Sequence, residues 1–177
     1  MSKAKLKKYL QTLPQEQLVE IILDLYNARK EAKEYLEFFL EPDQEKALEK
    51  AKKDIFRNYF TPQQYPRAKV SFKTGKEIVD DFIHLDIEPR LVADLMLYHA
   101  SISMSRIFAR RLVSEATWNS TISLFRKAAE YIVTYKLRDE MERKIEKLVE
   151  YAKYAPEYLH IPERMNNELA ELNFYES

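Results

Sequence analysis

Apolar residues recur at helical spacing along most of this chain. From about residue 14 to 40 the apolar positions of the repeat are Leu18, Ile21, Ile22, Leu25, Ala32, Leu36 and Phe39. Spacing of three and four residues places such side chains on one face of an α-helix and leaves the opposite face polar. The pattern therefore predicts amphipathic helices, and similar stripes continue toward the C-terminus.

The seven prolines lie between these stripes or in the first turn of one, where a missing N–H costs little. We therefore expect about seven helices, over about residues 3–11, 14–40, 43–60, 67–85, 87–112, 115–136 and 138–154. Asp43, Asp86 and Ser114 are suited to cap the third, fifth and sixth of them. One or two further helical turns are expected after Pro156.

Short connections between helices that each have one apolar face favour antiparallel packing of neighbours. The predicted fold class is therefore all-α, an antiparallel helix array or bundle, with a short α–α superhelix as one form of the array. A chain of 177 residues is long enough to bury its own core, so we expect one domain over residues 1–177. Gly75 lies within the predicted fourth helix, and it marks either a later helix start capped by Thr74 or a close approach by a neighbouring helix.

Composition excludes several classes of function. The 29 Lys and Arg residues balance 29 Asp and Glu residues, so no net charge draws the chain to nucleic acids. The absence of cysteine excludes disulfides, thiol catalysis and cysteine-ligated metals. A single glycine leaves no phosphate-binding loop or dinucleotide fingerprint. No cofactor and no catalytic residue is predicted.

Several short segments resemble a family of uncharacterised, all-helical bacterial cytoplasmic proteins. They are residues 2–10 (SKAKLKKYL), 16–18 (EQL), 24–26 (DLY), 30–40 (KEAKEYLEFFL), 93–97 (ADLML) and 118–120 (WNS). The resemblance is strongest over the first third, and residues 99–116 depart from the family pattern. It implies a helical fold in the bacterial cytoplasm, and it supplies no activity and no site residues.

Histidines are the first candidates for chemistry, because a carboxylate three residues before a histidine shares its helix face and is a unit of di-metal sites. Asp81 and His84 have this spacing, as do Glu157 and His160, although the two flanking prolines leave no room for a long helix around His160. A weak metal-dependent or acid–base alternative would combine Asp81 and His84 with Asp94 and His99. The competing interpretation is that these histidines are surface or capping residues.

Arginines and one tryptophan form the preferred candidate binding site. Arg106 and Arg110 lie one turn apart, Arg111 is adjacent, and Trp118 follows across a turn, so guanidinium donors could surround an aromatic platform. This group is our candidate anion- or partner-binding site. The structural alternative pairs the arginines with acidic residues and places Trp118 in the core.

We expect a non-enzymatic helical module that binds a protein or peptide, because the chain combines mixed charge and many tyrosines with no recognisable catalytic constellation. The tyrosines suited to a binding face are Tyr26, Tyr35, Tyr59, Tyr65, Tyr151, Tyr154 and Tyr158. A metal-dependent enzyme and a nucleic-acid-binding protein are the alternatives, the latter not favoured by net charge. We expect a cytoplasmic protein without membrane contact. The sequence is compatible with a homo-oligomer and does not predict one.

Overall fold

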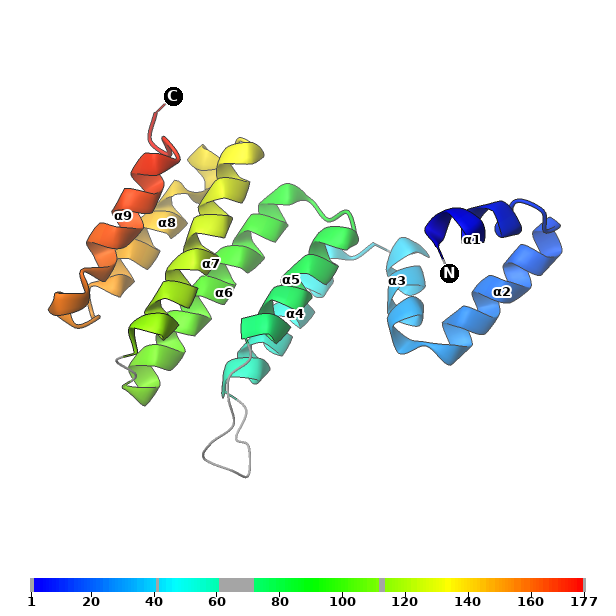
Figure 1. The fold of residues 1–177 in the computed structure, drawn as a ribbon, viewed down its shortest axis with the longest axis horizontal. Coiled ribbons are helices and arrows are strands. Elements are labelled where there is room, and N and C mark those ends of the chain that lie inside the picture. Colours follow the sequence, from blue (N-terminus) through cyan, green and yellow to red (C-terminus); the bar gives the residue numbers. More distant parts are fainter. Residues whose placement is uncertain (1, 41, 61–71, 112–113, 177) are drawn as a thin grey trace. The chain divides into compact units, whose positions relative to one another are not determined.

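The computed structural model describes residues 2–40, 42–60, 72–111 and 114–176. Every regular element in these residues is helical, which confirms the all-α prediction (Figure 1). The elements are α1 (Lys3–Leu10), α2 (Gln15–Ala28), α3 (Lys30–Leu40), α4 (Gln44–Phe60), α5 (Phe72–His84), α6 (Pro89–Arg110), α7 (Glu115–Thr134), α8 (Arg138–Ala152), the 3-10 helix η1 (Glu157–Leu159) and α9 (Ile161–Glu171). The chain divides into two compact units, residues 1–43 and 44–177.

The N-terminal unit contains α1, α2 and α3. The prediction of one helix over residues 14–40 is wrong, because Arg29 adopts an extended conformation with φ −134° and ψ 119° between α2 and α3. The break allows α3 to pack against α2, where the Tyr26 hydroxyl donates a hydrogen bond of 2.9 Å to Glu37 and Lys33 lies over the Tyr26 ring. Neither proline nor glycine marks this position in the sequence. We therefore attribute the break between α2 and α3 to tertiary packing.

The second unit is an array of three successive helix pairs, α4 with α5, α6 with α7 and α8 with α9 (Figure 1). The helices α4, α6 and α8 pack side by side in one layer, and α7 packs beside α9 in the other. Each pair contacts the next along the row. The second unit is therefore an open array of helix pairs. The sequence had allowed either an array or a bundle.

The core of the second unit is centred on α6. This helix buries side chains around most of its circumference, as expected of a helix with neighbours on several sides. Trp118 and Phe125 of α7 and Ile145 of α8 are completely buried in the same core. Burial of each such large side chain stabilises the fold by about 1.5–3 kcal/mol.

Some helix boundaries differ from the predictions. Asp86 does not cap α6, because its backbone is left-handed with φ 53° and the helix starts only at Pro89, after Glu88. The helical segment after Pro156 is longer than the one or two turns that were predicted. Pro162 does not interrupt α9, because it lies in the first turn of that helix. The connection expected between the predicted helices 43–60 and 67–85, and the predicted helix start at residue 67, lie outside the described residues.

No helix among the described residues is long and apolar enough to cross a membrane.

Candidate functional site

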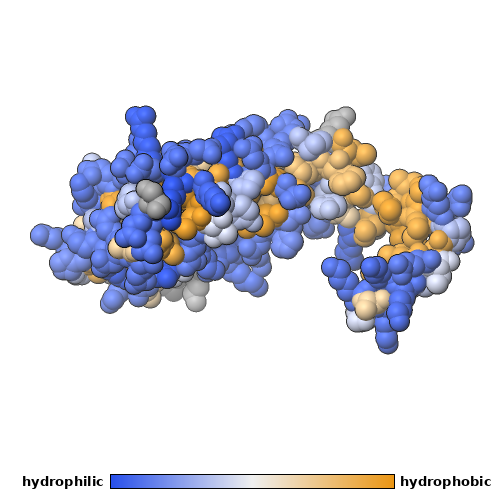
Figure 2. All heavy atoms as spheres, turned by 90° about the horizontal axis from the view of Figure 1, so that it is seen from above, coloured by the Kyte–Doolittle hydropathy of each residue, from blue (hydrophilic) through white to orange (hydrophobic). Residues whose placement is uncertain are grey.

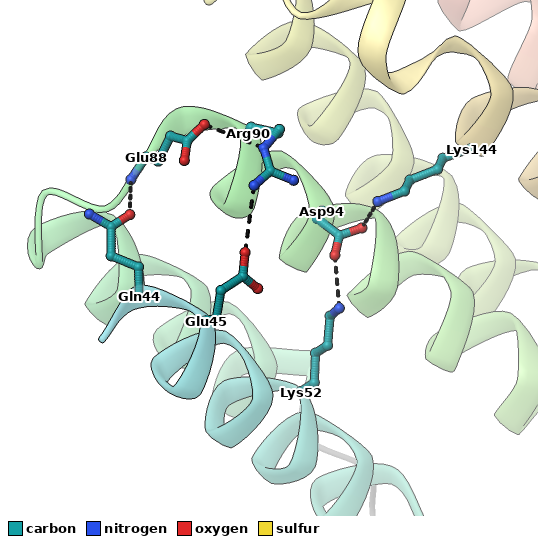
Figure 3. Close-up of polar contacts among 7 residues, drawn as sticks. All are labelled: Gln44, Glu45, Lys52, Glu88, Arg90, Asp94 and Lys144. Atoms are coloured by element: carbon teal, nitrogen blue, oxygen red, sulfur yellow. Dashed lines mark hydrogen bonds and ion pairs between the residues drawn. The ribbon is translucent and has the colours of Figure 1, made fainter. Parts of the chain in front are cut away.

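Charged side chains hold α4, α6 and α8 in position. Asp94 of α6 lies between two lysines, Lys52 of α4 at 2.8 Å and Lys144 of α8 (Figure 3). Burial alone would raise the pKa of Asp94, but hydrogen bonds from Lys144 and Lys52 outweigh it and hold that pKa below its ordinary value. The ionised Asp94 carboxylate therefore ties three helices together at neutral pH.

The first turns of α4 and α6 are connected in the same region. The backbone N–H of Glu88 donates to the Gln44 side chain at 2.9 Å, and Arg90 lies 3.5 Å from Glu45 and 3.3 Å from Glu88 (Figure 3). These contacts are largely exposed, so solvent screens them and each adds little to stability. Their main effect is to set the register of α4 along α6.

A polar network is buried between α4, α5, α6 and α7. The Tyr59 hydroxyl lies 3.0 Å from His99 Nε2, and the Ser103 hydroxyl lies 2.6 Å from that of Thr121. Burial lowers the pKa of His99 to about 4, aided by the charge of Lys76, and burial raises the pKa of Tyr59 to about 12. Both groups are neutral at neutral pH. Because His99 is only 2% exposed, the network positions helices and is not open to a substrate.

A cavity of about 510 Å³ opens where α6 ends, between α7 and the end of α8. We call it the aromatic pocket, and its lining residues are Ile107, Phe108, Arg111, Trp118, Tyr151, Tyr154 and Pro156. The Phe108 ring centroid lies 5.6 Å from that of Trp118 and 5.0 Å, edge to face, from that of Tyr151. A volume of this size suits a large side chain or a small ligand.

The polar groups of the aromatic pocket are mainly donors. Trp118 is completely buried, and its indole N–H has no hydrogen-bond acceptor within the described part of the chain. Arg111 is exposed at the C-terminus of α6, with left-handed backbone at φ 49°, and is the one charged residue among the described lining residues. The Tyr151 hydroxyl lies 3.3 Å from that of Ser105. The pocket therefore combines apolar walls with unmatched donors.

The structure divides the predicted arginine and tryptophan group between two places. Arg111 and Trp118 both line the aromatic pocket. Arg106 instead points toward α4, where it donates a hydrogen bond to the backbone carbonyl of Tyr59, and burial and the charge of Arg110 lower its pKa. Arg110 is exposed. Only half of the predicted group thus shares one cavity.

The residues of the weak metal alternative have separate surroundings. Asp94 is bound by its two lysines and His99 by Tyr59, while His84 Nδ1 lies 2.6 Å from the carbonyl of Asp80, and Asp81 is exposed. Within the described ranges no group of three or more His, Cys, Asp or Glu side chains could hold a metal ion. His160 occupies the N-cap position of α9 in a left-handed conformation, but its side chain forms no capping hydrogen bond.

Sequence reasoning missed part of the aromatic pocket. It named Tyr151 and Tyr154 only as members of a general set of tyrosines, and it did not single out Phe108 or Pro156. The signal for the two tyrosines is their three-residue spacing at the end of α8, which places them on one face. No local signal in the sequence associates Phe108 with them, because they lie more than 40 residues apart.

Comparison with protein families gives a match to the model of a family of unknown function (DUF6155) over residues 1–158. This range includes every described residue that lines the aromatic pocket. No curated protein and no solved structure matches the chain.

Proposed function

We propose that this chain, which belongs to the family of unknown function DUF6155, is a helical module that binds a protein or peptide through the aromatic pocket. The observation that carries the proposal is an open aromatic cavity at the joint of α6, α7 and α8 whose described lining contains donors and no carboxylate. A bacterial cytoplasmic setting, which the sequence resemblance implies, belongs to the same proposal.

The shape and lining of the pocket favour an apolar side chain as the anchoring group of the partner. Phe108, Trp118 and Tyr151 supply rigid walls, and Tyr154 at the rim is 78% exposed. Aromatic residues of this kind provide much of the binding energy in protein interfaces, because they bury a large area with few rotatable bonds. An apolar anchor that fills the pocket gains about 1.5–3 kcal/mol from burial.

The hydrogen-bond donors of the pocket indicate which partner groups can lie next to the apolar anchor. Arg111 can form a paired hydrogen bond with a carboxylate of the partner. The Trp118 N–H has no acceptor among the described residues, and a buried donor left unpaired costs about 1–3 kcal/mol. A partner carbonyl that reaches it after a small shift of the indole ring would relieve this cost. The expected motif is therefore an aliphatic or aromatic residue next to an acidic one.

Selection from a library of displayed linear peptides against the full-length protein tests this proposal. Peptides that bind are expected to share an apolar anchor with a neighbouring acidic residue. Because Trp118 is the single tryptophan of the chain, their binding should change its fluorescence. Arg111→Ala should weaken the binding of those peptides that have an acidic residue by about tenfold.

The variants Tyr154→Ala and Tyr158→Ala form a matched pair. Both tyrosines are exposed, at 78% and 67%, but only Tyr154 lines the pocket. Tyr154→Ala should weaken binding about tenfold and Tyr158→Ala should leave it unchanged. Selected peptides that bind both variants equally and leave the Trp118 fluorescence unaltered would show that the pocket is not the binding site.

A further inference from the structure

The N-terminal unit exposes an apolar surface that its own residues leave uncovered. Among the residues that the structure describes, ten of the sixteen exposed large hydrophobic ones belong to α1, α2 and α3, and none in this unit is buried. Figure 2 shows hydrophobic residues gathered on this unit, at the right of the view. Phe39 and Leu40 of α3 are 75% and 77% exposed.

The helix α2 is the centre of this surface. Its apolar residues extend around more than half of the helix circumference, and they include Ile21, Ile22, Leu23 and Leu25, each more than 40% exposed. Packing against α3 covers only part of such a wide arc. A helical unit of about 43 residues without disulfides lies near the lower size at which a chain buries enough surface to fold alone. Covering this apolar surface would therefore stabilise the unit.

The charges beside this surface are complementary to one another. The helix α1 has four lysines and no acidic residue, whereas α2 has Glu16, Glu20 and Asp24 and no basic residue. The three acidic residues are spaced by four, so they form one stripe along α2. Within the part of the chain that the structure describes, neither the lysines of α1 nor these acidic residues form an ion pair. The lysines of α1 and the acidic stripe of α2 are therefore available to an external partner.

We propose that the surface formed by α1, α2 and α3 binds the same surface of a second copy of this chain. In a two-fold symmetric pair, the lysines of α1 in each copy lie beside the acidic stripe of α2 in the other, so that the charge match occurs twice. The apolar arc of α2 is then covered by an equally apolar surface. Outside the aromatic pocket, the described exposed hydrophobic residues of residues 44–177 are fewer and lie on different elements, so they form no apolar surface of comparable width. This inference is independent of the aromatic pocket.

Charge reversal in the full-length protein tests the proposal. One variant carries Lys5→Glu with Lys8→Glu, and a second carries Glu20→Lys with Asp24→Lys. Sedimentation equilibrium over a range of concentrations should show a wild-type dimer, and the dissociation constant of each variant alone should rise at least about tenfold. An equimolar mixture of the two variants should restore a dimer, identified as a heterodimer by native mass spectrometry.

A control variant carries Lys127→Glu with Lys147→Glu, which changes the net charge by the same amount as the first variant but lies on exposed positions of α7 and α8. Its dimer should be as tight as that of the wild type, and circular dichroism checks that all variants remain helical. A wild-type chain that stays monomeric at every concentration would overturn the proposal. So would a dimer that both reversed variants form as tightly as the wild type, or a mixture that forms no heterodimer.

Discussion

Gly75 of α5 lies directly against the imidazole ring of His99 on α6. A Cβ atom built on Gly75 would lie 2.6 Å from His99 Cε1 and closer still to Nε2. The His99 ring cannot move away freely, because its Nε2 is in hydrogen-bond contact with the buried Tyr59 hydroxyl at 3.0 Å. The only glycine of the chain therefore serves the close approach of two helices and lies within α5.

Gly75→Ala should destabilise the fold although alanine is the better helix former. The added methyl group must displace the His99 ring, and such overpacking of a core costs about 1–3 kcal/mol. The measurement is the free energy of unfolding from urea denaturation. In a His99→Ala background the ring is absent, so Gly75→Ala should become neutral or stabilise by up to about 1 kcal/mol. Equal losses in both backgrounds would contradict the steric explanation.

His99 should make stability depend on pH between about 7 and 4. Its pKa is about 4 in the folded chain and about 6.5 unfolded, so in this range the unfolded state binds the additional proton. Stability is therefore fully present above about pH 7 and falls as the pH is lowered toward 4. The loss by about pH 5 should be near 2 kcal/mol.

The comparison of His99→Gln with His84→Gln checks this assignment. The glutamine side chain introduced by His99→Gln can still accept a hydrogen bond from Tyr59 but does not titrate. This variant should therefore lose most of the dependence between about pH 7.5 and 5. His84 is exposed, and His84→Gln should leave the dependence unchanged. An unaltered pH slope in His99→Gln would mean that other groups cause it.

Asp94→Asn should destabilise the fold by about 1–3 kcal/mol, because it removes the charge shared by Lys52 and Lys144 in a site only 18% exposed. Glu77→Gln is the matched control, since Glu77 pairs with Lys73 at 3.6 Å on the exposed surface of α5. Its effect should stay within about 0.5 kcal/mol. Thermal unfolding of both variants measures the difference, and equal effects would show that Asp94 does not tie the helices.

Lys136→Gly should stabilise the fold by about 1 kcal/mol. Lys136 follows the C-cap residue of α7 with φ 57°, a left-handed conformation that strains any residue with a Cβ and that glycine adopts freely. Lys153 ends α8 with φ −62°, where glycine brings no relief. Lys153→Gly should therefore be neutral or destabilising. A higher melting temperature for Lys136→Gly than for Lys153→Gly is the expected result; the reverse order would exclude strain at Lys136.

Much of the secondary structure was readable from the sequence, because helix formation depends on local patterns. The apolar stripes predicted α4 to α8, although not the full length of α9, and the prolines marked several helix starts, as Pro89 does for α6. The break at Arg29 had no such local sign. It follows from the packing of α3 against α2, which a one-dimensional pattern does not contain.

The candidate site could be predicted from the sequence to a smaller extent than the helices. The sequence by itself determined an all-helical chain, excluded thiol chemistry and predicted a candidate binding group of Arg106, Arg110, Arg111 and Trp118. Only the tertiary structure placed Phe108 and Tyr151 beside Trp118, turned Arg106 toward Tyr59 and set His99 against Gly75. The physical reason is that the apolar faces of amphipathic helices are chemically alike. Which faces meet is decided by the shape and packing of the whole unit, over separations that local periodicity does not encode.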